Sequence, residues 1–286
     1  MKPNFFIIGA PKSGTTSLAR YLSEHSEIIF SDPKETGYFD TDLHTSSWAN
    51  ESSYLDEAYP LTEKKYRAVG EGTVWNLYSR VAVDNILQFN PNAKFIVLLR
   101  NPVQIFHSLY YHRYFSGRET ASTFAKAWRI QKQRSYDSVS NPKTFLCADL
   151  YKLGDQLERL YKKVEKDRVL IIFFEDLKNN PALVYKRCLD FLEVSQDGKV
   201  DFEHVNPSRA INNKYIRNTV LFLRSIKKKL RINKPFGSTV LARRVVYQKK
   251  KPLPDTVRID IQRFLLDDIR KIEKLANRQL SHWYEQ

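Results

Sequence analysis

Eight residues near the N-terminus, Gly9 to Thr16 with the sequence GAPKSGTT, form a loop that could hold a phosphate group. The loop follows a short apolar run and leads into a segment with helical periodicity, so it would lie between a strand and the start of a helix. Consecutive backbone N–H groups at such a turn, together with the positive end of the helix dipole, bind anions. The residues that could contact a phosphate are Lys12, Ser13, Gly14, Thr15 and Thr16.

This loop differs from the GxxxxGK[ST] loop of nucleotide triphosphatases. The two glycines have the same spacing, but Thr15 stands where that motif has lysine, and the only lysine of the loop is Lys12. The apolar strand KFIVLL ends in Arg100, and the strand VLIIFF ends in Glu175-Asp176, so neither supplies a clear magnesium-binding aspartate. A kinase needs both the lysine and the metal. The loop is therefore predicted to hold a phosphate without a metal, and a nucleotide or sugar kinase is the alternative.

A second run, Arg100 to Ser108 with the sequence RNPVQIFHS, follows the KFIVLL strand. Pro102 suits the first turn of a helix, so Arg100 would end the strand and Ser108 would lie on the helix. The carboxyl ends of parallel strands meet at one edge of a sheet, where ligands bind. We therefore expect Arg100 on the same edge as the phosphate loop. An ordinary ion pair between Arg100 and a carboxylate is the alternative.

Together the two motifs resemble those of the sulfotransferases that use 3′-phosphoadenosine-5′-phosphosulfate (PAPS), most closely the heparan-type, carbohydrate and related bacterial enzymes. APKSGTTSLARYL is similar to their 5′-phosphosulfate loop, which implies that Lys12 contacts the bridging oxygen while residues 13–16 hold the 5′-phosphate. RNPVQIFHS is similar to their 3′-phosphate motif, which implies contacts from Arg100 and Ser108. The resemblance implies PAPS as the donor, 3′,5′-diphosphoadenosine as the product, and no metal.

An acceptor hydroxyl or amine must lose a proton as it attacks sulfur, so a general base is needed. Residues 33–40, PKETGYFD, resemble the Glu-x-x-(aromatic)-Phe-Asp segment of the same enzymes, which implies that Glu35 is the base with Lys34 and Asp40 beside it. The heparan glucosaminyl 3-O-sulfotransferases have a histidine where this chain has Gly37. The alternative is that Glu35 is a surface carboxylate paired with Lys34.

Two aromatic side chains are further candidates for the acceptor side of the site. His107 could compete as the base, since many small-molecule sulfotransferases use histidine, but within the second motif it is expected to pack or cap. Residues 71–78, EGTVWNLY, lie where relatives often have Glu-Lys-Thr-Pro and then an aromatic residue, and Gly72 replaces the lysine. Trp75 could line the acceptor or nucleotide pocket, or it could lie in the core.

The elements that would position these residues alternate between apolar strands and helical segments. Strands are predicted at Phe5–Ala10, Ile28–Phe30, Ala68–Thr73, Lys94–Leu99 and Val169–Phe174. Helices are predicted at Thr15–His25, Tyr78–Phe89, Pro102–Phe115, Ser122–Arg134, Asp149–Val164 and Pro181–Leu192, with a polar loop after the second strand through about Thr62. This alternation predicts a P-loop-type, three-layer α/β/α fold around a mostly parallel sheet. We expect one sulfotransferase domain over residues 1–286.

Positive charge is concentrated in one segment of the chain. From Arg209 to Lys251 there are fourteen Lys and Arg and no Asp or Glu, whereas the whole chain has a net charge of +15. By resemblance, a mobile basic segment at about residues 205–252 closes over PAPS, with Arg209 as a contact to the 3′-phosphate. Tyr215 to Ile232 also reads as an amphipathic helix with a cationic face, which could contact an anionic membrane or an acidic glycan. A solvated helix is the alternative, and without a base-reading motif we expect no specific nucleic-acid partner.

The composition is that of a globular chain, with 42% hydrophobic and 13% aromatic residues. No apolar run reaches the ~18–20 residues of a membrane span. Cys147 and Cys188 have no metal-binding spacing and are expected in the core, so we expect a cytoplasmic protein. The predicted function is direct in-line sulfuryl transfer to a hydroxyl or amine of a carbohydrate or small metabolite. A basic, non-catalytic module that binds membrane or nucleic acid is the other alternative.

Overall fold

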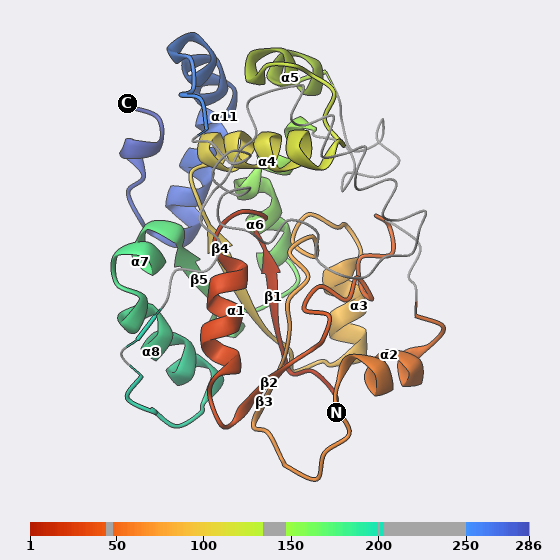
Figure 1. Cartoon of the computed structure of the whole chain (residues 1–286). Helices are drawn as coiled ribbons and strands as arrows, with labels where there is room; N and C mark the ends of the chain where they lie inside the picture. Colours follow the sequence, from red (N-terminus) through yellow and green to blue (C-terminus); the bar gives the residue numbers. More distant parts are fainter. Residues whose placement is uncertain (44–47, 134–146, 200, 203–249, 286) are drawn as a thin grey trace, which may run out of the picture.

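The computed structural model describes residues 1–43, 48–133, 147–199, 201–202 and 250–285. Within these residues five strands form one sheet in the order β2-β3-β1-β4-β5, and every neighbouring pair is parallel (Figure 1). The strands are β1 (Phe5–Gly9), β2 (Ile28–Phe30), β3 (Ala68–Glu71), β4 (Lys94–Leu99) and β5 (Val169–Phe173). The predicted parallel α/β sheet is confirmed, and β1 lies at its centre.

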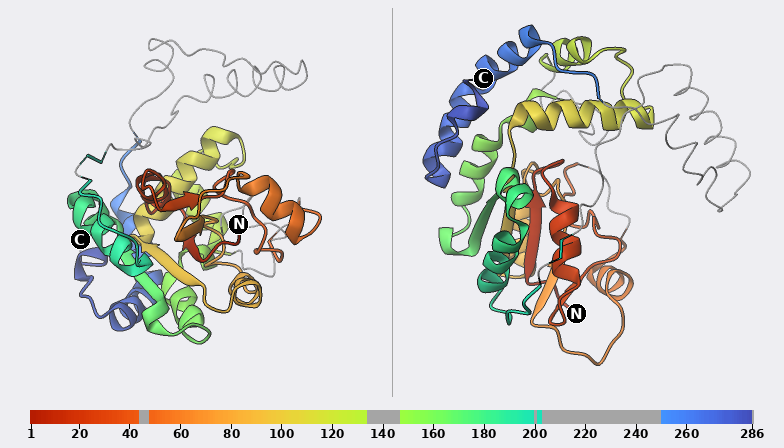
Figure 2. Two further views of the ribbon diagram at one scale, coloured as in Figure 1. Left: turned by 90° about the horizontal axis from the view of Figure 1, so that it is seen from below. Right: turned by 60° about the vertical axis from the view of Figure 1, so that its left-hand side comes forward.

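Helices cover both faces of the sheet and its carboxyl-terminal edge. The helices are α1 (Thr15–Ser23), α2 (Glu51–Ala58), α3 (Ala82–Phe89), α4 (Pro102–Ser116), α5 (Phe124–Gln131), α6 (Leu153–Tyr161), α7 (Phe174–Asn179), α8 (Pro181–Leu192) and α11 (Asp255–Ala276). Short 3₁₀ turns occur at Ala148–Tyr151, Lys166–Arg168 and Ser281–Trp283. α4 starts directly after β4 and lies across the upper end of the sheet, and α5 and α11 lie close to it (Figure 2).

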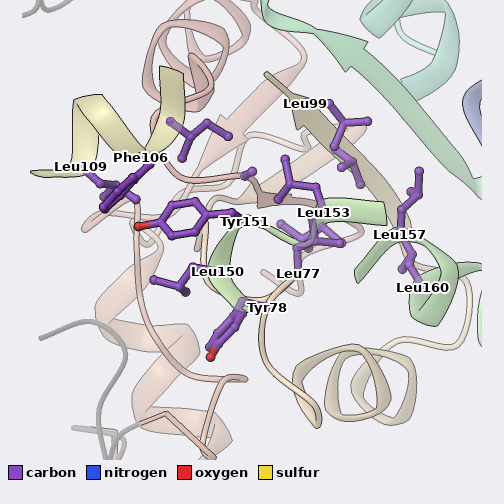
Figure 3. Close-up of a cluster of buried hydrophobic side chains, with 14 of the residues drawn as sticks. Leu77, Tyr78, Leu99, Phe106, Leu109, Leu150, Tyr151, Leu153, Leu157 and Leu160 are labelled. Atoms are coloured by element: carbon purple, nitrogen blue, oxygen red, sulfur yellow. The ribbon is translucent and has the colours of Figure 1, made fainter. Parts of the chain in front are cut away.

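The sheet is buried on both faces because its strands are apolar at nearly every position. Phe5 and Ile7 of β1 pack with α1 and α8 on one face, whereas Phe6 and Ile8 pack with α3, α4 and α6 on the other. A strand buried on both faces reads as a continuous apolar run, which is why β1 and β4 could be predicted from sequence. The larger cluster includes Tyr151, whose ring centroid is 4.9 Å from that of Phe106 (Figure 3).

Both cysteines lie in this core, as predicted. Cys147 belongs to the larger hydrophobic cluster and Cys188 to the smaller one, and both are fully buried thiols. Burial raises the pKa of each thiol. Cys147 also lies 3.2 Å from the hydroxyl of Tyr78, which ties it to the segment after β3.

Three described helices have no counterpart in the sequence prediction: α2, α7 and the 22-residue α11. The predicted polar loop contains α2, which starts with a capping box between Asn50 and Ser53. Only Tyr54 and Ala58 of α2 are buried, so its apolar repeat is weak. α7 begins at Phe174, which was predicted as the last residue of the fifth strand. In the first turn of α7, Oδ1 of Asp176 accepts a 2.8 Å hydrogen bond from Nη2 of Arg278, which lies beyond α11. That long-range pairing leaves no local signal.

Two predicted helices have different limits in the structure. The helix predicted over Tyr78–Phe89 begins only at Ala82, because the carboxylate of Asp42 accepts hydrogen bonds from the preceding turn. The helix predicted over Asp149–Val164 divides at Lys152 into a 3₁₀ turn and α6. In both cases tertiary contacts outweigh the local helical pattern.

Most of the basic segment lies outside the described residues, including Arg209 and the predicted amphipathic helix at Tyr215–Ile232. The end of the segment is described, and it lies against α4. The backbone N–H of Lys251 donates to the hydroxyl of Tyr111 at 3.0 Å, and the backbone oxygen of Lys251 lies 3.0 Å from Nε2 of His107. None of the described helices combines the length and the apolar character needed to cross a membrane.

Candidate anion-binding and catalytic site

The glycine-bounded loop connects the central strand β1 to α1 at the carboxyl-terminal edge of the sheet. Gly14 is the N-cap of α1 and has φ = +93°, a conformation that glycine adopts without steric cost. A Cβ atom at this position would lie 2.9 Å from Cδ2 of Leu177 in α7. The loop is anchored to the neighbouring strand by a 2.7 Å hydrogen bond from the N–H of Ala10 to the oxygen of Leu98. The backbone N–H groups of the first turn of α1 are thereby fixed in place.

The hydroxyl groups of this loop differ in their surroundings. Ser13 is fully buried, and its Oγ has no hydrogen-bond partner in the structure. Thr15 is buried and Thr16 is exposed. Buried hydroxyls are nearly always hydrogen-bonded in native proteins. An unsatisfied hydroxyl beside a helix N-terminus therefore fits a site that receives an oxygen-rich anion.

The structure brings the two predicted anion motifs together. Nη1 of Arg100 donates to the backbone oxygen of Lys12 at 2.8 Å, and Nε donates to Oε1 of Gln104 at 3.1 Å. The Arg100 guanidinium carbon also lies 4.0 Å from the centre of the Phe174 ring, at the start of α7. β1, β4 and β5 are consecutive in the sheet, so the loops after these three strands meet at this point.

Positive charges are crowded at this edge. Burial lowers the pKa of Lys12, the Arg100 guanidinium lowers it further, and the Glu35 carboxylate opposes the change. The Lys12 residue as a whole is nevertheless exposed to solvent. Burial also lowers the pKa of Arg100, and Glu175 opposes this. A bound anion would relieve the repulsion between the two cations.

A third cation at this edge was missed by the sequence analysis. Nζ of Lys250 donates to Oγ of Ser108 at 3.3 Å, although 142 residues separate them. The pKa of Lys250 is lowered to about 8, first by burial and then by the charges of Lys12 and Arg100. The run of three lysines that includes it was a signal of positive charge, but it did not indicate which lysine would reach α4.

Two histidines of α4 lie near the same site. The ring of His107 packs edge-on against Tyr111 and Phe124, with centroid distances of 5.0 and 5.1 Å, and burial lowers its pKa. The expectation that His107 packs is confirmed. His112, one turn beyond Ser108, is exposed, and its pKa is lowered to about 4 by burial and then by Lys12. Sequence analysis did not single out His112, because nothing in the sequence shows that Lys12 lies near it.

Glu35 lies in the loop after β2, and 45% of its side chain is exposed. Its Oε1 is 3.6 Å from Nζ of Lys34, so the ion pair that the sequence allowed is present. Nζ of Lys34 also donates to the backbone oxygen of Gly72 at 2.7 Å, and burial lowers the pKa of Lys34. The negative charge of the Glu35 carboxylate opposes the lowering of the Lys12 pKa, so the two groups interact electrostatically.

The two other predicted acceptor-side residues lie deeper. Asp40 is fully buried. Trp75 is half-buried against the larger hydrophobic cluster, and its ring centre is 5.8 Å from the guanidinium carbon of Arg113. Trp75 therefore packs against the core. Across the described part of the chain, no group of three or more His, Cys, Asp and Glu side chains is placed to hold a metal ion.

A parallel sheet with a glycine-bounded anion loop after its central strand and an arginine after the next strand defines an α/β protein of the P-loop type. The chain belongs to the sulfotransferase family, because the family model of the sulfotransferase domain matches residues 2–231. The predicted family is thus confirmed. The crystal structure of a sulfotransferase from Alicyclobacillus acidocaldarius is similar over 99% of both chains, with 25% sequence identity and a TM-score of 0.73.

Two curated relatives match parts of the chain. The membrane-associated sulfotransferase kil1 of Dictyostelium discoideum is 35% identical over 105 residues, which are 36% of this chain and 21% of that protein. The carbohydrate sulfotransferase 15 of Homo sapiens is 27% identical over 164 residues, which are 43% of this chain and 29% of that protein. The matched regions span less than a third of the length of either relative.

Proposed function

We propose that this chain transfers the sulfuryl group of PAPS to a hydroxyl or amine of an acceptor by direct in-line displacement. The observation that carries the proposal is the crowding of Lys12, Arg100 and Lys250 at one edge of the sheet. Each of these cations has a lowered pKa, and those of Lys12 and Lys250 are lowered partly by the neighbouring cations. Such an arrangement favours a ligand that carries negative charge at more than one position.

The residues at this edge fit a donor with two phosphate positions. The backbone N–H groups of residues 14–16 and the unsatisfied hydroxyl of Ser13 suit the 5′-phosphosulfate. Arg100, Ser108 and Lys250 suit the 3′-phosphate, because a guanidinium, a hydroxyl and an ammonium converge there. Arg209 is a further contact that we expect on sequence grounds.

Two residues have chemical roles in this proposal. Glu35 accepts the proton of the acceptor as the acceptor oxygen or nitrogen forms its bond to sulfur. The bond between sulfur and the bridging oxygen of the 5′-phosphate breaks in the same step. Lys12 stabilises the negative charge that builds on that oxygen, where a fixed ammonium has its largest effect. The products are the sulfated acceptor and 3′,5′-diphosphoadenosine.

We expect the acceptor to be a carbohydrate or a small metabolite. The partial match to a carbohydrate sulfotransferase and the carboxylate base both favour this class. The cationic 209–251 segment is expected to add a peripheral contact to anionic membranes, and a partial relative is named membrane-associated. We expect the protein to be located in the cytoplasm.

Isothermal titration with 3′,5′-diphosphoadenosine in metal-free buffer tests the donor site. We expect tight binding to the wild type, far weaker binding of ADP, and a loss of about 30-fold or more in Arg100→Met, since truncating one partner of a hydrogen-bonded charge pair costs about 2–5 kcal/mol. Lys12→Met is expected to weaken the binding of PAPS. Lys162→Met is the matched control, because Lys162 is an exposed cation just beyond the end of α6.

The ADP arm distinguishes the two enzyme classes. Binding of 3′,5′-diphosphoadenosine that collapses in Arg100→Met but not in Lys162→Met supports a 3′-phosphate site. Equal or tighter binding of ADP, or a requirement for magnesium, would overturn the proposal and favour the kinase alternative.

A further inference from the structure

A fully buried carboxylate, Glu71, lies at the end of β3 behind the predicted catalytic base. Its Oε1 accepts hydrogen bonds from the backbone N–H of Thr36 (3.3 Å), the hydroxyl of Thr36 (3.0 Å) and the hydroxyl of Thr73. Its Oε2 accepts from the backbone N–H of Thr73 (3.1 Å) and from Nδ2 of Asn76 (3.3 Å). All five hydrogen bonds are donated to Glu71. Burial raises the pKa of this carboxyl group, and the hydrogen bonds from Thr73 and Thr36 oppose that rise.

These hydrogen bonds join two loops that are far apart in sequence. Thr36 follows Glu35 in the loop after β2, whereas Thr73 and Asn76 belong to the segment after β3. The N–H of Gly37 also donates to Oγ1 of Thr73 at 3.1 Å. Glu71 therefore fixes the backbone on the carboxyl side of Glu35 to the neighbouring strand.

The amino side of Glu35 is fixed to the same strand. The N–H of Gly72 donates to the oxygen of Lys34 at 3.1 Å, and Nζ of Lys34 donates back to the oxygen of Gly72 at 2.7 Å. A Cβ atom at Gly72 would lie 3.0 Å from two carbons of the Lys34 side chain, so the absence of a side chain there leaves room for Lys34. Glu35 is held between two residues that are both bonded to the end of β3.

The geometry points to Glu71 as a positioning residue that sets the direction of Glu35 for proton transfer. This inference rests on the proposed function, because it takes Glu35 as the base. A misplacement of about 1 Å can cost about 10²-fold in rate, so a buried hydrogen-bond hub behind the base has a large effect on turnover. Glu71 acts through Glu35 and needs no contact with the acceptor.

The substitution Glu71→Gln tests the inference with nearly the same side-chain volume. Each carboxylate oxygen of Glu71 faces one backbone N–H, that of Thr36 or that of Thr73. Whichever way a glutamine turns, its NH₂ group faces one of those donors, so one loop must move. A milder variant, Thr36→Ala, removes one of the five donors to Glu71 and serves if E71Q folds poorly. It also removes the hydroxyl that accepts from the N–H of Tyr38 at 3.3 Å.

A double-mutant cycle with Glu35→Gln separates positioning from stability. Turnover is measured as release of labelled sulfate from [³⁵S]PAPS to water, which serves as the acceptor hydroxyl. We expect E35Q to lose about 10²-fold or more and E71Q about 10- to 100-fold. The combined E35Q/E71Q variant should be within about threefold of E35Q alone. The stoichiometry of 3′,5′-diphosphoadenosine binding reports the folded fraction of each variant.

The control is Asp268→Asn in α11, another buried carboxylate that accepts two backbone hydrogen bonds, from Gly154 and Asp155 at 2.9 Å. Its effect should multiply with that of E35Q, because Asp268 holds the start of α6 and not the base. Losses of E71Q and E35Q that multiply in the same way, or an E71Q enzyme with wild-type turnover, would overturn the role of Glu71 alone. A wild type without binding of 3′,5′-diphosphoadenosine overturns the proposed function. An E35Q enzyme with wild-type turnover overturns the base and this inference together.

Discussion

The lowered pKa of Lys250 predicts that the affinity of the proposed donor site depends on pH. In the ligand-free protein this pKa is about 8, because the ammonium is partly buried and lies near Lys12 and Arg100. A phosphate bound between Ser108 and Lys250 would favour the charged ammonium and raise the pKa toward its ordinary value of 10.5. Binding of 3′,5′-diphosphoadenosine above pH 8 must then be accompanied by uptake of a proton.

The size of the effect follows from the shift. With a pKa of about 8, roughly half of the Lys250 side chains are neutral at pH 8 and about 90% at pH 9. The dissociation constant should therefore rise about tenfold between pH 7 and pH 9, which is about 1.4 kcal/mol. The second ionisation of a phosphate, near pH 6, is complete below this window. His107 and His112 also titrate below it, because their pKa values are lowered from 6.5.

Titration calorimetry in two buffers with different ionisation enthalpies measures this proton uptake directly. We expect nearly one proton per bound ligand at pH 9 and almost none at pH 7. The variant Lys250→Met should bind more weakly at pH 7 and lose most of the uptake at pH 9. The Lys162→Met control should behave as the wild type.

The contrary result is also informative. A dissociation constant that stays constant from pH 7 to pH 9, or an uptake that persists in Lys250→Met, would mean that Lys250 does not contact the ligand. Persistent uptake would point to Lys12, whose pKa is also lowered.

Two further predictions concern stability. Gly14→Ala should reduce the free energy of unfolding by about 2–4 kcal/mol, because it adds strain at positive φ and an overlap with Leu177. Gly198→Ala is the control, with φ = +69° and nothing within 4 Å of the added Cβ. It should reduce the free energy of unfolding by only about 1 kcal/mol. Equal losses in urea unfolding would contradict this reasoning. Burial raises the pKa of Asp268 from 3.8 to about 6, so the folded state binds the extra proton between these values and stability falls as pH rises through them. The wild type should lose about 3 kcal/mol relative to Asp268→Asn between pH 3.5 and pH 7, and a constant difference across that range in urea unfolding would refute this role.

The sheet and the anion loop could be predicted because their signals are local. The runs FFIIG and KFIVLL are apolar at nearly every position, and the glycine-bounded turn between β1 and α1 is contiguous in sequence. Arg100 could be placed at the same edge because parallel strands all end there. None of these local signals depends on a contact between distant segments.

The parts that could not be predicted depend on distant partners. Lys250 reaches Ser108 across 142 residues, and α7 is held by Arg278 across 102 residues. In the sequence, Glu71 stood out only as part of a segment that resembles one of the sulfotransferase family. Its role as a hydrogen-bond acceptor could not be predicted, because its five donors come from two separate loops. The Lys34–Glu35 ion pair could be stated as an alternative because the two residues are adjacent.

The order of the strands divides the edge of the sheet into two halves. The loops after β1 and β4 carry Lys12 and Arg100, and Phe174 follows β5, whereas Glu35 follows β2 and its support Glu71 ends β3. Because the two halves are built from separate strands, one can change while the other stays intact. Under the proposed function, exchange of residues 33–40 together with 71–76 between relatives is therefore a route to new acceptors. Leu77 is left in place, because its N–H donates to the oxygen of Ile8 in β1 at 2.8 Å. Buried hydrogen bonds join these two segments, so they would have to be exchanged together. For the same reason we expect the two segments to change together among relatives.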